Sequence, residues 1–343
     1  MTPTSAAAAF ALALAACGGQ FRAAAPTAPP AAEEPPPLAV ADAGLPVSML
    51  DARTGTQLEV EAAWSRLAAA RAVCVGEEHP DPHHHWAQRE IVTELARRAT
   101  ARGTPMALGF EMFQRPFQGV LDDFAAGRID EAALRSRTAW DDRWGYDFAL
   151  YRPAIEAARA AGAALLALNT ERELTKQITR GGVDGLTPAQ RATLPELVLD
   201  DPRHRAWWDA IMAEMASGHG HGHGHGQAEG HAAPADGPID PDVPPADPIY
   251  TAQVLWDETM ADGGARWLAA HPDGQLVILA GTGHCHDSAV VGRLARRIDA
   301  EVLSVRPVVD DGDGAVARAL VERANDVLWV MTRRDDGPAD GAP

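Results

Sequence analysis

The sequence predicts an α/β fold in which helices cover both faces of a mostly parallel central sheet, within a single domain that carries a helical insertion. Short segments that are almost entirely apolar, such as 72–75 and 275–280, alternate with longer segments that carry apolar residues at helical spacing. Strands of this kind are buried on both faces, which is typical of a parallel sheet between two layers of helices. With 343 residues and 46% hydrophobic content, the chain is long enough to build such a core.

The elements follow one another in an alternating order. We predict strands at 72–75, 106–110, 163–168, 275–280, 301–307 and 326–331. We predict helices at 58–71, 83–100, 116–126, 130–138, 151–161, 171–179, 201–217, 249–270 and 287–298. Segment 140–146 is expected to form an aromatic turn, and Thr187-Pro188 resembles a helix start with Pro at its first position. The histidines at 83–85 open a helix and are expected to cap it or to face solvent.

The first 17 residues are predicted to be a lipoprotein signal peptide. The apolar run from Ala6 to Ala16 has the length of a signal sequence and is too short for a bilayer span. It ends in Leu14-Ala15-Ala16-Cys17, which resembles the lipobox of bacterial lipoproteins, whose cysteine is lipidated. Because residues 1–5 contain no Lys or Arg, a disordered Ala-rich tail is the alternative. Cys17 is the predicted lipidation site.

The domain organisation follows from composition. Residues 18–47 are rich in Pro and Ala and are expected to form an extended tether. The folded domain is predicted at 48–331, with a disordered His/Gly/Pro-rich insertion at 218–247 and a disordered tail at 332–343. We therefore expect a lipid-anchored protein of the bacterial cell envelope, at the outer membrane and facing the periplasm or the cell surface.

The charge balance excludes one class of partner. The chain has 48 acidic and 30 basic residues, which gives a net charge of -18. Without a basic stripe that could displace phosphate counterions, nucleic acid is not an expected partner, and the charge fits solubility.

The sequence leaves the oligomeric state open, with a homodimer as a candidate.

Ionisable side chains follow three of the predicted strands. Glu77 and His79 come after the first strand, Glu111 after the second, and His284 after the fourth. Parallel strands bring their carboxyl ends to one edge of the sheet, so these side chains are expected to converge. Two carboxylates and two imidazoles suit a divalent transition metal or an acid–base pair. We predict all four as metal ligands, although each alone also fits a helix cap or a loop hydrogen bond.

Two further cysteines lie in the folded region. Cys74 is inside an apolar strand, and Cys285 follows Gly281-Thr282-Gly283-His284. No CxxC spacing occurs, so a cysteine zinc site is not supported. A disulfide between the two forms only if their strand ends are adjacent, and we interpret Cys74 as a small buried hydrophobe.

The segment Gly76-Glu77-Glu78-His79, followed by Asp81-Pro82 and His84-His85, resembles the opening motif of the ChaN-like haem-binding uptake lipoproteins. That family belongs with the TIKI/TraB and erythromycin-esterase proteins, which share a Gly-Glu-x-His signature. Further segments match the family pattern in order, at 108–113, 140–146, 151–153, 166–169, 253–261 and 280–284. The resemblance covers about residues 48–309, apart from the insertion.

The resemblance implies a membrane-anchored lipoprotein that binds haem or a metal ion in iron uptake. It also implies kinship to metal-dependent hydrolases, in which residues matching Glu77, His79, Glu111 and His284 line the active site. Glu77 and Glu111 are then the candidate catalytic bases, and whether any hydrolase activity remains is open. Tyrosine is a known haem ligand. Tyr146 and Tyr151 are therefore candidate haem ligands, although both also fit the packing of the aromatic turn.

A His–Gly repeat lies inside the predicted insertion and has no counterpart in the family pattern. Its histidines alternate with glycine: His219, His221, His223 and His225. Imidazoles on a flexible segment suit loose capture of Zn, Ni, Cu or haem iron, and we predict these four as accessory metal-capture residues. A neutral low-complexity expansion explains the repeat equally well.

Overall fold

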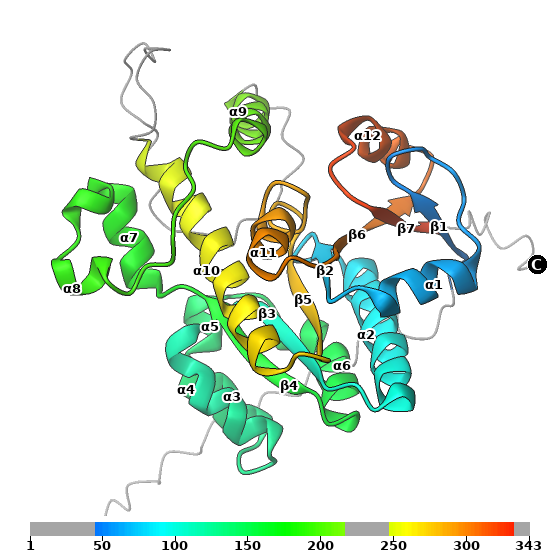
Figure 1. The fold of residues 1–343 in the computed structure, drawn as a ribbon, viewed down its shortest axis with the longest axis horizontal. Helices are drawn as coiled ribbons and strands as arrows, with labels where there is room; N and C mark the ends of the chain where they lie inside the picture. The colour runs from blue at the N-terminus through cyan, green and yellow to red at the C-terminus, as the bar shows by residue number, and fades with distance from the viewer. Residues whose placement is uncertain (1–44, 217–246, 333–343) are drawn as a thin grey trace, which may run out of the picture. The chain divides into compact units, whose positions relative to one another are not determined.

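The computed structural model describes residues 45–216 and 247–332, and seven strands of this part form one sheet. The strands are β1 (Val47–Asp51), β2 (Ala72–Glu77), β3 (Met106–Gln114), β4 (Ala164–Asn169), β5 (Gln275–Gly281), β6 (Val302–Asp310) and β7 (Val327–Thr332). Their order is β1-β7-β6-β2-β5-β3-β4 (Figure 1). Every neighbouring pair is parallel except β1 and β7, so the predicted mostly parallel sheet is confirmed.

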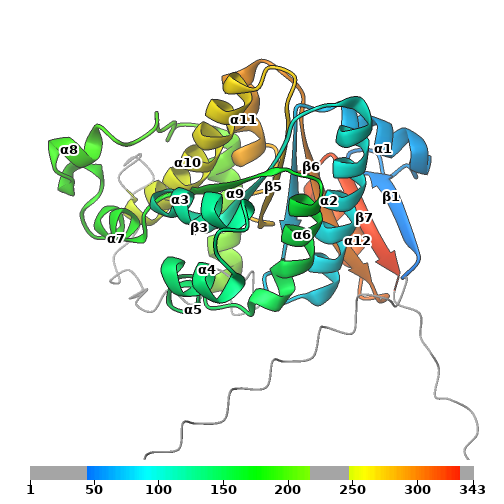
Figure 2. The ribbon, with the colours of Figure 1, turned by 90° about the horizontal axis from the view of Figure 1, so that it is seen from below.

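Helices cover both faces of this sheet (Figures 1 and 2). One face packs against α1 (Val60–Ala69), α2 (Pro82–Arg102) and α6 (Phe148–Ala160). The other packs against α10 (Pro248–Ala270), α11 (Val290–Ile298) and α12 (Ala315–Glu322). Because successive strand residues point to opposite faces, Val73 and Val75 of β2 join the first core, whereas Cys74 joins the second.

The remaining helical elements are short, except one. They are η2 (Arg115–Phe117), α3 (Gln118–Ala125), α4 (Glu131–Thr138), α5 (Trp140–Arg143), α7 (Arg172–Gly181), η3 (Val183–Gly185), α8 (Pro188–Arg191) and α9 (Pro202–Ala216). The predictions missed β1 and α12 and assigned α5 to a turn. β1 is an edge strand that buries only Met49, and α12 buries only Ala319, so both are short elements that lie largely outside the buried core.

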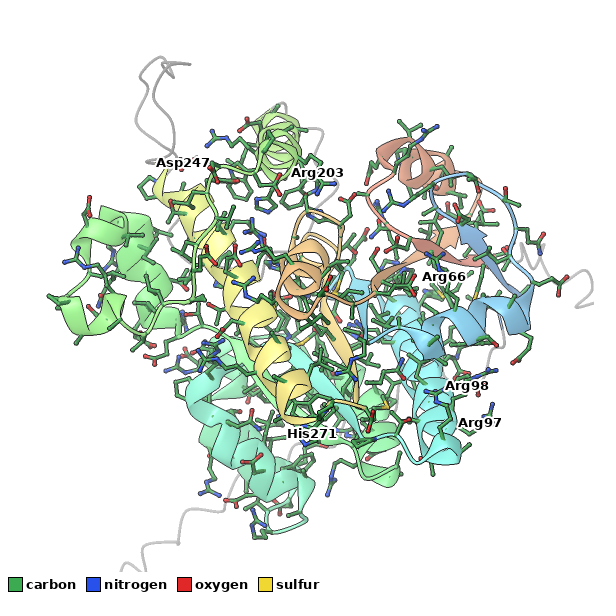
Figure 3. The ribbon with its side chains drawn as sticks, viewed as in Figure 1. Arg66, Arg97, Arg98, Arg203, Asp247 and His271 are labelled. Carbon is green, nitrogen blue, oxygen red and sulfur yellow. A yellow bond between two sulfur atoms is a disulfide. The ribbon has the colours of Figure 1, made fainter. Side chains whose placement is uncertain are left out.

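Helix α10 is well defined at both ends. The side chain of Asp247 accepts hydrogen bonds from the N–H groups of Ile249 and Tyr250, and Pro248 occupies the first turn. Figure 3 labels Asp247 at the start of this helix and His271 at its end. The helix matters for function because it passes beside the carboxyl end of β5 with polar residues on its buried face.

Several predicted features fall outside the described residues. They are Cys17, nearly all of the tether and the tail, and the His–Gly repeat with His219, His221, His223 and His225. Within residues 45–216 and 247–332, no helix combines the length and the apolarity needed to cross a bilayer.

Candidate functional site

The predicted site residues converge around Gly281, the last residue of β5. β5 lies between β2 and β3, and Gly281 is the register partner of Glu77. The backbone N–H of Gly281 donates to Oε2 of Glu111 at 2.7 Å. A Cβ atom at this position would lie 3.1 Å from Cε1 of His79 and 3.6 Å from Oε2 of Glu111. The absence of a side chain at Gly281 therefore lets His79 and Glu111 approach one another across the strand end.

Glu77 is buried and its carboxylate is fully engaged. Oε1 accepts a hydrogen bond from the hydroxyl of Tyr151 at 2.9 Å and lies 2.7 Å from Nδ1 of His79. Oε2 accepts from the side-chain amide of Gln88 at 2.7 Å. Burial by itself would raise the pKa of Glu77, but the imidazoles of His85 and His79 and the hydrogen bonds outweigh it and lower the pKa. Glu77 is therefore held as a carboxylate.

His79 is a buried imidazole that contacts a carboxylate and two aromatic rings. Burial would lower its pKa, but the carboxylate of Glu77 outweighs burial, so the pKa is raised. Its ring lies 4.7 Å from the ring of Trp144 and 5.1 Å from that of Tyr146, measured between centroids. His79 also lines a cavity. The imidazole thus borders both an aromatic cluster and an open space.

Glu111 and Asp257 enclose His284 from opposite sides. Nδ1 of His284 lies 2.7 Å from Oδ1 of Asp257, and its Nε2 lies 3.4 Å from Oε1 of Glu111. Burial would lower the pKa of His284, but the two carboxylates raise it to about 10. Likewise, burial would raise the pKa of Glu111, but His284 and its other partners lower it to about 2. At neutral pH the site therefore holds an imidazolium between two carboxylates.

These side chains form two pairs, Glu77 with His79 and Glu111 with His284. In the part of the chain that the structure describes, no group of three or more His, Cys, Asp or Glu side chains is placed to hold a metal ion. The metal-binding role of Glu77, His79, Glu111 and His284 stays a prediction.

The two tyrosines predicted as haem ligands differ in availability. The hydroxyl of Tyr151 is buried, accepts a hydrogen bond from the indole N–H of Trp144 at 2.9 Å and donates to Glu77. The side chain of Tyr146 is partly exposed and forms no hydrogen bond within the described residues. Burial, followed by the charge of Glu77, raises its pKa. Of these two tyrosines, Tyr146 is the one whose phenol a ligand can reach without breaking the hydrogen bonds of Glu77.

The sequence predictions missed four polar residues that orient the site. Gln253 and Asp257 lie one turn apart on α10, and His85 and Gln88 lie one turn apart on α2. Polar pairs at this spacing on the apolar face of a helix are the signal that could have found them. His84 and His85 are buried, and Nε2 of His85 lies 2.6 Å from the carbonyl oxygen of His79. The expectation that the histidines at 83–85 only cap the helix or face solvent was therefore wrong for these two.

Cys74 and Cys285 form a disulfide. Their Cα atoms are 5.3 Å apart, because Cys285 lies in the loop after β5 and β5 pairs with β2. Cys74 is buried in the core as predicted, but the preference for a simple hydrophobe over a disulfide was wrong, because the adjacency that a disulfide requires is present. The bond fastens the loop that carries His284 to the strand that leads to Glu77.

A cavity of about 180 Å³ opens beside His79 and His284. Helix α9 forms one wall of it, and residues of β6 and α12 form another. The residues of these two walls that lie on secondary-structure elements are Trp207, Ala210, Ile211, Arg306 and Glu322. The site therefore combines buried acid–imidazole pairs with a partly apolar opening.

The chain matches one known protein family and resembles a solved structure. A family model described as haem-binding uptake, Tiki superfamily, ChaN matches residues 63–294. A solved structure of ChaN of Campylobacter jejuni with cofacial haem has a TM-score of 0.58 and 15% identity, covering 83% of this chain and 96% of that one. At that identity the likeness concerns the fold alone.

Two more distant similarities were found. An erythromycin esterase in its open conformation has a TM-score of 0.43 and 12% identity, covering 86% of this chain and 100% of that one. The chloroplastic protein RETICULATA-RELATED 5 of Arabidopsis thaliana is 27% identical over 132 residues. That match covers 37% of this chain and 17% of the length of the plant protein.

Proposed function

Since the chain belongs to the family of haem-binding uptake proteins of the Tiki superfamily that is named for ChaN, we propose that it is a lipoprotein that binds haem in iron uptake. The observation that carries the proposal is the phenol of Tyr146. It is partly buried beside His79 at the carboxyl edge of the sheet, and it has no hydrogen-bond partner within the described residues. Haem is the cargo, and Tyr146 would be the axial ligand of its iron.

The surroundings of Tyr146 fit this role. The ring of Trp144 lies 5.7 Å from that of Tyr146, so the phenol sits against aromatic surface that can pack on a porphyrin. The raised pKa of Tyr146 keeps the phenol protonated without a ligand. A bound iron would favour the phenolate, because a metal ion lowers the pKa of a group that it coordinates.

The cell envelope is the compartment that we propose. A buried disulfide between Cys74 and Cys285 is favoured by an oxidising compartment such as the periplasm. The lipobox-like sequence that ends at Cys17 independently supports a lipid anchor. In cells fed labelled palmitate, the full chain should incorporate label and partition with membranes, whereas Cys17→Ala should do neither. Label in the variant, or none in the wild type, contradicts the anchor.

Titration with haem tests the binding function. The full chain should give a shifted Soret band that saturates at a defined stoichiometry. Tyr146→Phe should weaken binding by about tenfold or more and change the spectrum, because the iron loses an anionic ligand. Replacing His219, His221, His223 and His225 by Gln removes loose capture and should leave the saturable phase intact. An absence of saturable binding, or an unchanged spectrum in Tyr146→Phe, contradicts the proposal.

A hydrolase is the second candidate, and one observation favours it. Glu77 holds Nδ1 of His79, and the imidazole lines the cavity, which is the arrangement of a general base. Hydrolysis of a panel of esters, lactones and peptides should then be lost in His79→Gln. Elemental analysis of the wild type and Glu77→Ala tests whether a metal takes part. No turnover of any substrate by the wild type removes this candidate.

A further inference from the structure

The outer wall of the cavity contains a tryptophan that is fixed in place. The ring of Trp207 lies 4.2 Å from that of His286 and is stacked on His204 at 5.4 Å and 29°. Both histidines are buried, so they hold the indole against the cavity. Ala210 and Ile211 follow three and four positions later on α9 and line the same space. Together these three side chains form an apolar part of the cavity wall.

An arginine lines the same cavity. Arg306 of β6 is ion-paired with Glu322 of α12. The side chain of Arg306 is 14% exposed, whereas that of Glu322 is 50% exposed. The guanidinium of Arg306 is therefore held in place. The carboxylate of Glu322, which is paired with it, can rotate into solvent and leave the guanidinium free to bind another group. Because a guanidinium has five N–H donors in a planar fork, it can bind a second carboxylate bidentately.

We propose that this cavity recognises the carboxylate-bearing edge of a porphyrin, with Arg306 pairing with a propionate in place of Glu322 and Trp207 packing on the ring. The identity of the ligand rests on the haem-binding function proposed above. A volume of about 180 Å³ is below the range of about 300–1,000 Å³ of pockets that enclose a whole ligand. Only one edge of the porphyrin therefore enters. The exposed carboxylate of Glu78 also lines the cavity, so the propionate is directed to the Arg306 side.

Iron-free porphyrins test this inference without iron ligation. The probes are protoporphyrin IX and its dimethyl ester, whose binding to the full chain is followed by porphyrin fluorescence. The wild type should bind the free acid about tenfold or more tightly than the ester. Arg306→Gln should abolish that preference by weakening the free acid alone. Glu322→Gln should strengthen the free acid, because the competing carboxylate is gone. Trp207→Leu should weaken both probes equally.

Arg318→Gln is the matched control. Arg318 is paired with Asp313 on the surface of the same region and does not line the cavity, so both affinities should stay at wild-type values. Thermal unfolding should show that each variant is folded. A wild-type preference that survives in Arg306→Gln overturns the inference. The inference is also overturned if the wild type binds the free acid and the ester with equal affinity and millimolar propionate displaces the probe. That result would indicate a site for free carboxylates. If haem still gives the Tyr146-dependent spectrum in either case, the proposed function stands.

Discussion

Nδ1 of His284 lies 2.7 Å from Oδ1 of Asp257, and this contact joins the loop after β5 to the middle of α10. Both side chains are buried, and Glu111 approaches the opposite edge of the imidazole at 3.4 Å. The arrangement stores a positive charge between two carboxylates. It also fixes the orientation of His284 at the cavity.

The His284 contact predicts a pH dependence of stability. The pKa of His284 is raised from 6.5 to about 10 in the folded chain, so its contribution is complete below pH 6.5 and is lost as the pH rises towards 10. Urea unfolding at several pH values in this window should show a declining free energy of unfolding. In Asp257→Asn the decline should be smaller, because one of the two carboxylates that raise the pKa is gone. Equal slopes in the two proteins contradict the assignment.

The disulfide predicts a redox dependence of stability. The bond closes a separation of 211 residues, so breaking it should lower the free energy of unfolding by about 2–5 kcal/mol. Reductant should destabilise the wild type and leave the double variant Cys74→Ala and Cys285→Ala unaffected. Urea unfolding with and without reductant makes the comparison. A wild type that is insensitive to complete reduction, verified by thiol titration, refutes the prediction.

Gly281→Ala should disturb the strand end. The new Cβ would lie 3.1 Å from Cε1 of His79, whose ring is held by Glu77 and cannot move freely. We expect a loss of about 1–3 kcal/mol in the free energy of unfolding. Gly119→Ala is the control, because nothing lies within 4 Å of its Cβ and α3 should gain about 0.4–1 kcal/mol. If the two variants are equally stable, a Cβ atom at position 281 is not crowded by His79, and the prediction is wrong.

Replacing each of the two tyrosines by phenylalanine should have different effects, on stability at Tyr151 and on haem binding at Tyr146. Tyr151→Phe removes the hydroxyl that donates to Glu77, which should cost about 1.5–3 kcal/mol of stability while the haem spectrum stays that of the wild type. Tyr146→Phe should change the haem spectrum and alter stability by no more than about 0.5 kcal/mol, since its hydroxyl has no partner within the described residues. Denaturation measurements and haem absorption spectra of both variants test these two expectations. A haem spectrum that changes only in Tyr151→Phe reverses the assignment.

Part of the site could be predicted from strand endings. Glu77, Glu111 and His284 each follow an apolar run, and parallel strands place such residues at one edge of the sheet. Their hydrogen-bond partners could not be predicted in the same way. Asp257 and Gln88 reach the site from helices on opposite faces of the sheet, and the packing of each helix decides which of its residues meets the strand end.

The sequence by itself determined the fold class, the family and the edge of the sheet at which the ionisable residues gather, because apolar periodicity and ordered motifs are local properties of a chain. Tertiary structure alone decided how those residues are used. It paired Cys74 with Cys285 and Glu77 with His79 and Tyr151, and among the described residues it left the phenol of Tyr146 without a hydrogen-bond partner. The physical reason is that pairing depends on distances across the sheet, which are fixed only when strand order and helix packing are fixed.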